Sequence, residues 1–278
     1  MTVSRFLRSK VEDLYLVRHG ESPQNKFLQH IRERTIEGEE LRNMFKGMGH
    51  SRWLGLTEHG VEQARAAGRW LRNEFGKAAP NCLLTASPTR ARETAGYIHM
   101  EMGLGDAVWK EEVCFDERNW GAFDHLGHPG FFNGDYERLR SYYRDHAVDL
   151  GPSDGESLRD LYIRAYQRLQ YLIVTKGIFG KTVLVSHYDT IGCLGVWLKG
   201  GRVEDLWEVD KLRDATVIPQ NGAIFHYSRR DPASGKLSDK LRWVRKICPW
   251  NHTCDMEWTE IPTASRRHCL TLADLIKK

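Results

Sequence analysis

The sequence predicts an α/β fold, a three-layer sandwich in which helices cover both faces of a mostly parallel sheet. Short apolar runs alternate along the chain with longer stretches in which apolar residues recur every three or four positions. This alternation is typical of strands that are connected by helices. The apolar runs contain few polar residues, as expected of strands that are buried on both faces. Because neither an internal repeat nor a linker interrupts the pattern, we expect residues 1–278 to form one domain.

The first half of the chain begins with a short buried strand at residues 14–17. Residues 26–56 are polar and show no clean period, so we expect them to run over the surface. A helix is predicted to begin at Thr57, which is a favourable N-cap residue. The next strand is expected at residues 82–86. Ser87-Pro88 then places an N-cap residue before a proline, a combination that begins helices.

The second half of the chain contains the clearest strand, TVLVS at residues 182–186. Residues 122–154, which precede it, are rich in Gly, Phe, Tyr and His and form a second predicted excursion. A long helix with one apolar face is expected from about Ser157. Two late strands are expected at residues 223–227 and 241–247. Residues 231–278 are therefore predicted to be a C-terminal strand and an appendage of unassigned structure.

The composition limits the class of protein. Charged residues make up 28% and hydrophobic residues 41% of the chain, which is ordinary for a globular protein. The net charge of +4 comes from scattered Lys and Arg residues, so we expect no nucleic-acid partner. No apolar run is long enough to cross a bilayer and the N-terminus has no secretory pattern, so we expect no membrane partner. The six cysteines lie far apart, as in a cytoplasmic protein with reduced thiols.

Conspicuous polar residues follow three of the predicted strands. The first strand ends at Arg18-His19, the loop after the second carries Arg90, and TVLVS ends at His187. In open α/β sheets, ligands bind beyond the carboxyl ends of the strands. Guanidinium groups match phosphate oxygens in geometry, so these residues together predict a site for a compact dianion. A single Arg or His at a strand end is more often a surface or structural residue, so the prediction depends on their joint position.

Six ordered sequence blocks connect these residues to a known family. They are LVRHGES followed by Asn25, LTEHG at 56–60, SPTRARETA at 87–95, DERNWG at 116–121, GESL at 155–158 and LVSHYDTI at 184–191. The chain thereby resembles the histidine phosphatase superfamily, the phosphoglycerate-mutase-like enzymes. The blocks occur in family order and span about residues 13–230. One block alone would be weak support, whereas six in order are specific.

The resemblance implies roles for the residues at the strand ends. His19 would be the nucleophile that becomes phosphohistidine, Arg18 and Arg90 would bind the phosphoryl oxygens, and His187 would complete the pocket. The chemistry agrees, because imidazole attacks phosphorus only when neutral, and neighbouring cations lower its pKa. The same cations stabilise charge on the equatorial oxygens during transfer, so we expect no metal and no cofactor. Gly20 is expected to let the phosphate approach the backbone.

The remaining matches are open to more than one interpretation. Glu117 matches the family acid that protonates the leaving oxygen, although the adjacent Asp116 makes a simple acidic turn an alternative. Asn25 matches the family asparagine near the phosphate. Ser22 would add a hydroxyl to the phosphate pocket or serve only as a turn residue. Glu156-Ser157 is explained equally by catalysis and by capping of the helix that follows.

The expected reaction is hydrolysis of a small phosphate monoester by a phosphatase. Mutases of this family resemble a longer pattern, Glu-Arg-x-Tyr-Gly followed by Gly-Leu-Asn-Lys, whose lysine holds the substrate carboxylate. This chain has Trp120 in place of the tyrosine and Ala122-Phe123-Asp124-His125 in place of the segment with lysine. These departures favour a phosphatase over a phosphoglycerate-mutase-type phosphotransferase. A non-catalytic phosphate-binding scaffold is a third interpretation.

The two excursions are expected to influence the choice of substrate. If they fold over the strand ends, they would form a cationic and aromatic lid, whereas a small satellite core is the alternative. The residues concerned are Arg32, Arg34, Arg42, Lys46, His50, Arg52 and Trp53 in the first excursion, and Phe123, His125, His128, Phe131, Phe132, Tyr136, Tyr142 and Tyr143 in the second. The natural substrate and the oligomeric state, including a homodimer, are left open by the sequence.

Overall fold

The computed structural model describes residues 11–33, 35, 40, 43, 49–124, 142, 145–175, 177–206 and 219–261. Its centre is a seven-stranded sheet in the order β3-β2-β4-β1-β5-β6-β7. The strands are β1 (Val11–Arg18), β2 (Cys82–Thr85), β3 (Lys110–Glu111), β4 (Gly180–Ser186), β5 (Ile224–Ser228), β6 (Trp243–Ile247) and β7 (Met256–Glu260). Strands β1 to β4 pair in parallel, whereas β5, β6 and β7 continue the sheet in antiparallel pairs.

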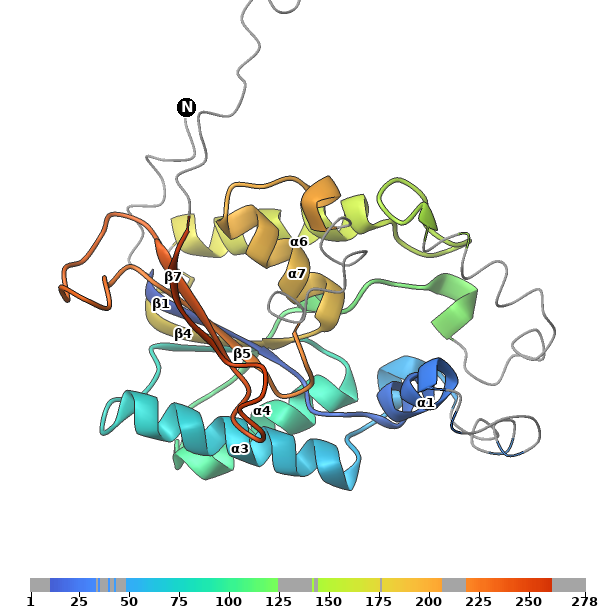
Figure 1. The fold of residues 1–278 in the computed structure, drawn as a ribbon, viewed down its shortest axis with the longest axis horizontal. Helices are drawn as coiled ribbons and strands as arrows, with labels where there is room; N and C mark the ends of the chain where they lie inside the picture. The colour runs from blue at the N-terminus through green and yellow to red at the C-terminus, as the bar shows by residue number, and fades with distance from the viewer. Residues whose placement is uncertain are drawn as a thin grey trace, which may run out of the picture.

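Helices cover both faces of this sheet, which confirms the predicted α/β sandwich (Figure 1). Helices α3 and α4 pack against each other on one face, and α6 and α7 pack against each other on the opposite face. Within the described residues, the α-helices are α1 (Pro23–Glu33), α3 (Glu58–Phe75), α4 (Thr89–Met102), α6 (Leu158–Val174) and α7 (Tyr188–Leu198). The 3-10 helices in the same part of the chain are η2 (Ser51–Trp53), η3 (Val113–Phe115) and η4 (Gly121–Asp124).

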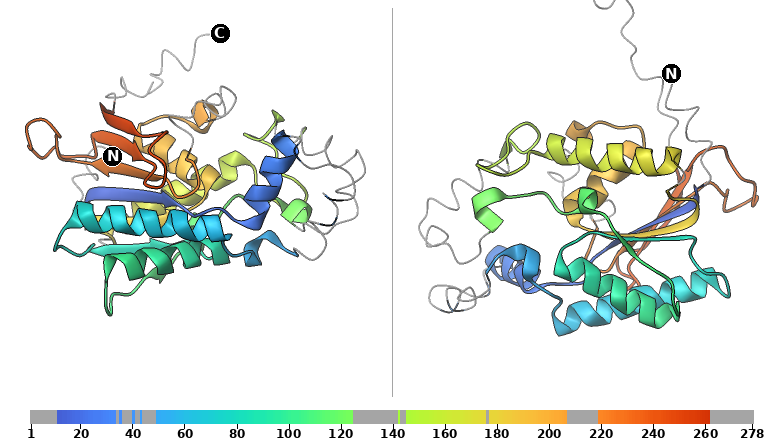
Figure 2. Two further views of the ribbon diagram at one scale, coloured as in Figure 1. Left: turned by 60° about the horizontal axis from the view of Figure 1, so that its bottom comes forward. Right: turned by 180° about the vertical axis from the view of Figure 1, so that it is seen from behind.

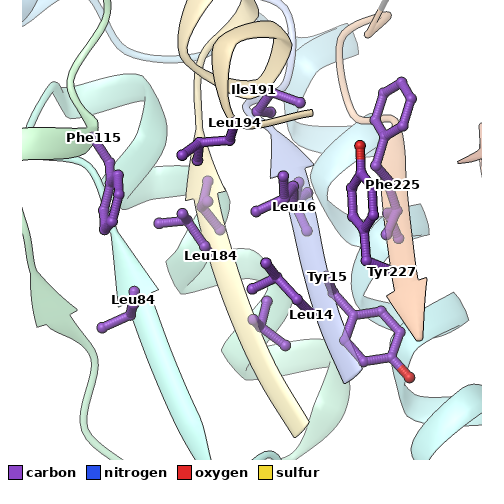
Figure 3. Close-up of a cluster of buried hydrophobic side chains, with 14 of the residues drawn as sticks. Leu14, Tyr15, Leu16, Leu84, Phe115, Leu184, Ile191, Leu194, Phe225 and Tyr227 are labelled. Carbon is purple, nitrogen blue, oxygen red and sulfur yellow. The ribbon is translucent and has the colours of Figure 1, made fainter. Parts of the chain in front are cut away.

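The main core lies on both faces of the central strands, because successive side chains of a strand point to opposite faces. Tyr15 of β1 packs against Trp70 and Phe75 of α3 on one face. Leu16, its neighbour, lies on the other face among the buried residues of β4 and α7 (Figure 3). This double burial explains why the strands read as unbroken apolar runs, and it makes β1 and β4 a rigid base for the residues that follow them.

The structure confirms two of the predicted helix starts and corrects the third. Thr57 is the N-cap of α3, and its hydroxyl accepts a hydrogen bond from the amide of Gly60 at 3.0 Å, as predicted. Ser157 is the N-cap of α6 and forms a capping box with Asp160. The prediction for Ser87 was wrong, because Pro88 occupies the N-cap position of α4. The Ser87 hydroxyl donates instead to Asp116 at 2.5 Å.

Helix α1 and strand β7 are among the elements that the sequence analysis did not predict. Residues 23–33 form α1 rather than part of an irregular excursion, and the signal was present, because Ser22-Pro23 repeats the pattern of Ser87-Pro88. Strand β7 pairs with β6 and extends the sheet into the segment that had no assignment. Among the described residues, no helix combines the length and apolar character needed to cross a membrane.

Candidate active site

The carboxyl ends of β1 and β4 bring two histidines together. The strands are parallel neighbours, with Arg18 aligned to Ser186, so His19 and His187 leave the sheet at the same level. Their ring centroids lie 4.9 Å apart, and both side chains are buried. The amide of His19 donates to the carbonyl oxygen of Ser186 at 3.0 Å, which fixes the backbone at this point. Register alone therefore creates the pair that the sequence predicted.

The hydrogen bonds of His19 define its tautomer. Its Nδ1 lies 2.6 Å from the carbonyl oxygen of Gly20, which can only accept, so Nδ1 carries the proton. Its Nε2 receives a hydrogen bond from Nε of Arg90 at 3.2 Å, so Nε2 holds the lone pair. Arg90 is itself anchored on α4 and donates Nη1 to the carbonyl oxygen of Ser51 at 2.8 Å. The basic nitrogen thus faces the guanidinium group.

The surroundings keep His19 uncharged. Burial lowers its pKa well below the ordinary value, and the positive charges of Arg90 and Arg18 lower it further. Burial is the larger cause, whereas the sequence suggested only the cations. Burial also lowers the pKa of Arg18, to about 10, so this guanidinium stays charged at neutral pH. The site therefore combines a neutral imidazole with permanent cations.

Three buried nitrogen atoms around His19 have no hydrogen-bond partner among the described residues. They are Nε of Arg18 and both ring nitrogens of His187. A buried polar atom without a partner costs about 1–3 kcal/mol, so such atoms in one place indicate a site that a ligand completes. Arg18 also donates Nη1 to the carbonyl oxygen of Pro219 at 2.7 Å, which holds its side chain in position. Cationic and neutral donors of this kind suit an anion with several oxygens.

The acidic pair after β3 is separated by the structure into two different environments. Asp116 accepts hydrogen bonds from the amide of Ser87 at 2.7 Å and from Nη1 of Arg52 at 3.0 Å, so its carboxylate is engaged structurally. Oε1 of Glu117 accepts from the backbone amides of Arg118 at 3.0 Å and Asp189 at 3.2 Å. The two carboxylates therefore have different partners, which favours Glu117 as the acid.

Glu117 holds a proton more firmly than an ordinary carboxyl group. Burial and the negative charge of Asp189 raise its pKa from 4.5 to about 7. The backbone hydrogen bond from Arg118 and the charges of Arg90 and Arg18 oppose this shift. Glu117 therefore holds its proton to a higher pH than an ordinary carboxyl group, as a general acid requires.

The loop that carries Glu117 is held from α6. Arg164 binds Glu156 with two hydrogen bonds, at 2.8 and 2.7 Å, and donates Nη1 to the carbonyl oxygen of Cys114 at 2.9 Å. Glu156 in turn accepts from the amide of Asn119 at 3.1 Å. Together with the capping box of Ser157, these contacts explain the GES block by local structure.

Gly20 has a structural role that was not predicted, whereas its predicted role in the approach of the phosphate stays a prediction. A Cβ atom added there would overlap the carbonyl oxygen of Gly60 and lie 2.8 Å from its carbonyl carbon. At Gly60 an added Cβ would in the same way overlap the backbone of Glu21. The loop after β1 and the first turn of α3 therefore touch backbone to backbone, and both glycines are required by this contact.

Asn25 and Ser22 lie at the start of α1 beside this loop. Oδ1 of Asn25 accepts from the hydroxyl of Ser22 at 3.0 Å and from Nδ2 of Asn221 at 3.1 Å. The hydroxyl of Ser22 is thereby used locally, which favours its turn role. Asn221, which was not predicted, also donates to the carbonyl oxygen of His19 at 3.1 Å. It stands just before β5, where no sequence block marks it.

The predicted lid can be followed only in part. Helix α1 and the η4 turn lie at the same end of the molecule, beyond the carboxyl end of β1 (Figures 1 and 2). His50, Arg52, Trp53 and Tyr142 have described side chains, and Trp53 is exposed. The side chains of Arg32, Arg34, Arg42, Lys46, Phe123, His125, His128, Phe131, Phe132, Tyr136 and Tyr143 lie outside the described part of the chain. The lid therefore stays a prediction.

Comparisons with known proteins agree with this arrangement. The family model of the histidine phosphatase superfamily (branch 1) matches residues 14–218. A 2,3-bisphosphoglycerate-dependent phosphoglycerate mutase from Chelativorans sp. (strain BNC1) is 31% identical over 207 residues, which cover 74% of this chain and 89% of the relative. The corresponding mutase from Methylobacterium radiotolerans is 32% identical over 194 residues, which cover 67% of this chain and 79% of the relative.

Solved structures support the fold. A mycobacterial glucosyl-3-phosphoglycerate phosphatase superposes with a TM-score of 0.55 at 20% identity, covering 78% of this chain and 92% of the other. An α-ribazole phosphatase from Shigella flexneri superposes with a TM-score of 0.55 at 17% identity, covering 82% and 98%. Phosphatases and mutases thus both occur among the similar proteins. From the family match and the relatives above 30% identity, the chain belongs to the histidine phosphatase superfamily.

Proposed function

We propose that the protein is a metal-independent phosphatase that hydrolyses a small phosphate monoester through a phosphohistidine on His19. The observation that carries this proposal is the state of the His19 ring: buried, uncharged, and with the lone pair of Nε2 facing Arg90. Such a nitrogen is a nucleophile, and the guanidinium beside it stabilises the oxygens of the group that it attacks.

In the first half-reaction, the lone pair of Nε2 forms a bond to phosphorus while the bond to the ester oxygen breaks. Arg18, Arg90 and the neutral His187 hold the phosphoryl oxygens. The carboxyl group of Glu117 donates its proton to the departing oxygen, which leaves as an alcohol. Because an alkoxide is a poor leaving group, this proton transfer lowers the barrier most for alkyl esters.

In the second half-reaction, water attacks the phosphorus of phosphohistidine. The carboxylate of Glu117 removes a proton from the water, the phosphorus–nitrogen bond breaks, and inorganic phosphate leaves. The bond from Nδ1 to the carbonyl oxygen of Gly20 keeps the ring in one tautomer throughout, so each cycle returns His19 to its neutral state. Asn25 is assigned to the phosphate pocket through its amide nitrogen, because its Oδ1 is already occupied.

A phosphoglycerate mutase is the alternative, and the names of the curated relatives favour it. The departures at Trp120 and at residues 122–125 favour hydrolysis, because the lysine-bearing segment for the substrate carboxylate is missing. The two reactions share the phosphohistidine and differ in what accepts the phosphoryl group. Transfer to water and transfer to a phosphoglycerate are therefore the quantities to compare.

The test is turnover of p-nitrophenyl phosphate and 3-phosphoglycerate in the presence of a chelator, with rapid-quench labelling of the enzyme. We expect phosphate release from the wild type, an acid-labile and base-stable label on His19, and loss of both in His19→Ala. Interconversion of phosphoglycerates that requires 2,3-bisphosphoglycerate and exceeds hydrolysis would establish the mutase. Phosphate binding by a folded protein with no turnover would establish the scaffold.

A further inference from the structure

Arg118 and Asp189, which the sequence did not predict as site residues, both contact the proposed proton donor. The amides of Arg118 and Asp189 both donate to Oε1 of Glu117, at 3.0 and 3.2 Å. Their side chains form an ion pair, with Nε of Arg118 3.3 Å from Oδ2 of Asp189 but not in hydrogen-bond geometry. Residues that are far apart in the sequence therefore hold one oxygen of Glu117 and place an ion pair beside it.

We infer that Asp189 is a positioning residue that keeps the Glu117 carboxyl group protonated between catalytic cycles, and that Arg118 anchors Asp189 for this purpose. The inference rests on the proposed function, since it concerns the acid of that reaction. Asp189 lies in the first turn of α7, directly after the strand end that supplies His187. The same element thus delivers a phosphate ligand and the residue that controls the acid.

The charges around Glu117 explain why such a residue is needed. Most neighbours favour the ionised form: the guanidinium groups attract a carboxylate, and the two amide donors bind it. Asp189 is the neighbouring negative charge that opposes them, and its effect on the pKa of Glu117 is second only to that of burial. The charged and titratable groups that interact with Glu117 are Arg18 at the end of β1, Arg90 on α4, Arg118 in its own loop, Arg164 on α6, and Asp189 and Cys193 on α7.

Arg118 is built as an anchor rather than as a phosphate ligand. Its side chain is only 4% exposed, and its guanidinium carbon lies 3.8 Å from the ring centroid of Trp120. A guanidinium stacked on an indole is held in one plane. This contact fixes the cation on the Asp189 side of the loop, and it gives Trp120 a structural role.

The experiment compares Asp189→Asn with the wild type over pH 5.5–9, with phenyl phosphate as substrate, because its leaving group needs a proton. Asparagine keeps the size of the side chain and the amide donor but removes the charge. We expect the upper limb of the kcat/KM profile to move down by about one pH unit. The ratio of kcat/KM at pH 8 to that at pH 6 would then fall about five-fold. Glu260→Gln on β7 is the matched control, since it removes one negative charge far from the site.

The ratio of kcat/KM at pH 8 to kcat/KM at pH 6 distinguishes the inferred effect from misfolding, because misfolding lowers kcat/KM at both pH values together. Asp189→Ser should give the same shift if the asparagine variant does not fold. A ratio equal to that of the wild type in a folded Asp189→Asn variant would overturn the inference. In Glu117→Gln, the upper limb should be absent and Asp189→Asn should have no further effect on it. If the wild type does not turn over phenyl phosphate, or if His19→Ala turns it over equally well, the proposed function fails instead.

Discussion

The backbone contact between Gly20 and Gly60 makes a strong prediction about Gly20→Ala. The added Cβ would lie 2.8 Å from the carbonyl carbon of Gly60, whereas carbon atoms in contact lie about 3.5–4.0 Å apart. To remove this overlap, the loop after β1 must move away from α3 by most of 1 Å, on the order of the difference between these distances. Since both partners are backbone, no side-chain rotation provides this space.

The hydrogen bonds of this loop oppose the movement. The amide of Gly20 donates to the hydroxyl of Thr94 at 3.1 Å, and the amide of Glu21 donates to Gln63 at 2.8 Å. Overpacking costs about 1–3 kcal/mol, and each weakened hydrogen bond adds about 1 kcal/mol. We therefore expect Gly20→Ala to lower the free energy of unfolding by about 3 kcal/mol, within the sum of these ranges. The corresponding fall in Tm is about 5 °C, because 278 residues have an unfolding entropy of about 0.6 kcal/mol/K.

The assay is urea denaturation followed by linear extrapolation, together with kcat/KM, because the carbonyl of Gly20 orients His19. Gly96→Ala is the matched control: Gly96 lies inside α4, and an added Cβ meets nothing within 4 Å. We expect this control to be as stable as the wild type or more stable by up to about 1 kcal/mol. If the free energy of unfolding of Gly20→Ala stays within about 0.5 kcal/mol of the wild-type value, the close contact does not constrain the loop and the reasoning is wrong.

Three further predictions concern residues other than His19 and His187. Burial raises the pKa of Asp13, but hydrogen bonds from His226 and Ser228 outweigh it and hold the pKa below the ordinary value. The stabilisation of the fold by ionised Asp13 should therefore be present at neutral pH and be lost as the pH falls below about 4. In Asp13→Asn, the free energy of unfolding should depend less on pH between pH 7 and pH 3. Ser157→Ala should lower the free energy of unfolding by about 1 kcal/mol through loss of the capping box, measured by urea denaturation, and an unchanged value would argue against the cap. Arg164→Met should lower kcat/KM about ten-fold more for an alkyl phosphate than for p-nitrophenyl phosphate. The reason is that a less firmly held Glu117 matters most when the leaving group needs a proton. An equal loss on both substrates would mean that Arg164 has only a structural role.

Much of the fold was predictable because its signals are local. Apolar runs, N-cap residues and helical periodicity concern neighbours in the sequence, and they located most strands and helices. The errors arose where a local signal had a competing partner or was overlooked. Ser87 has the chemistry of an N-cap, but Asp116 binds its hydroxyl more directly, whereas Ser22-Pro23 marked a helix that was assigned to an excursion.

The order of residues is enough to show which chemical groups follow the strands, and therefore that the site offers imidazole and guanidinium groups to an anion. The partners and orientation of those groups depend on the folded chain. The fold directed Asp116 to Ser87 and Glu117 to the amide of Asp189, and it placed Gly20 against Gly60. The physical reason is that these contacts join residues about 30 to 70 positions apart. Strand register and helix packing bring them together, and neither can be read from the order of neighbouring residues.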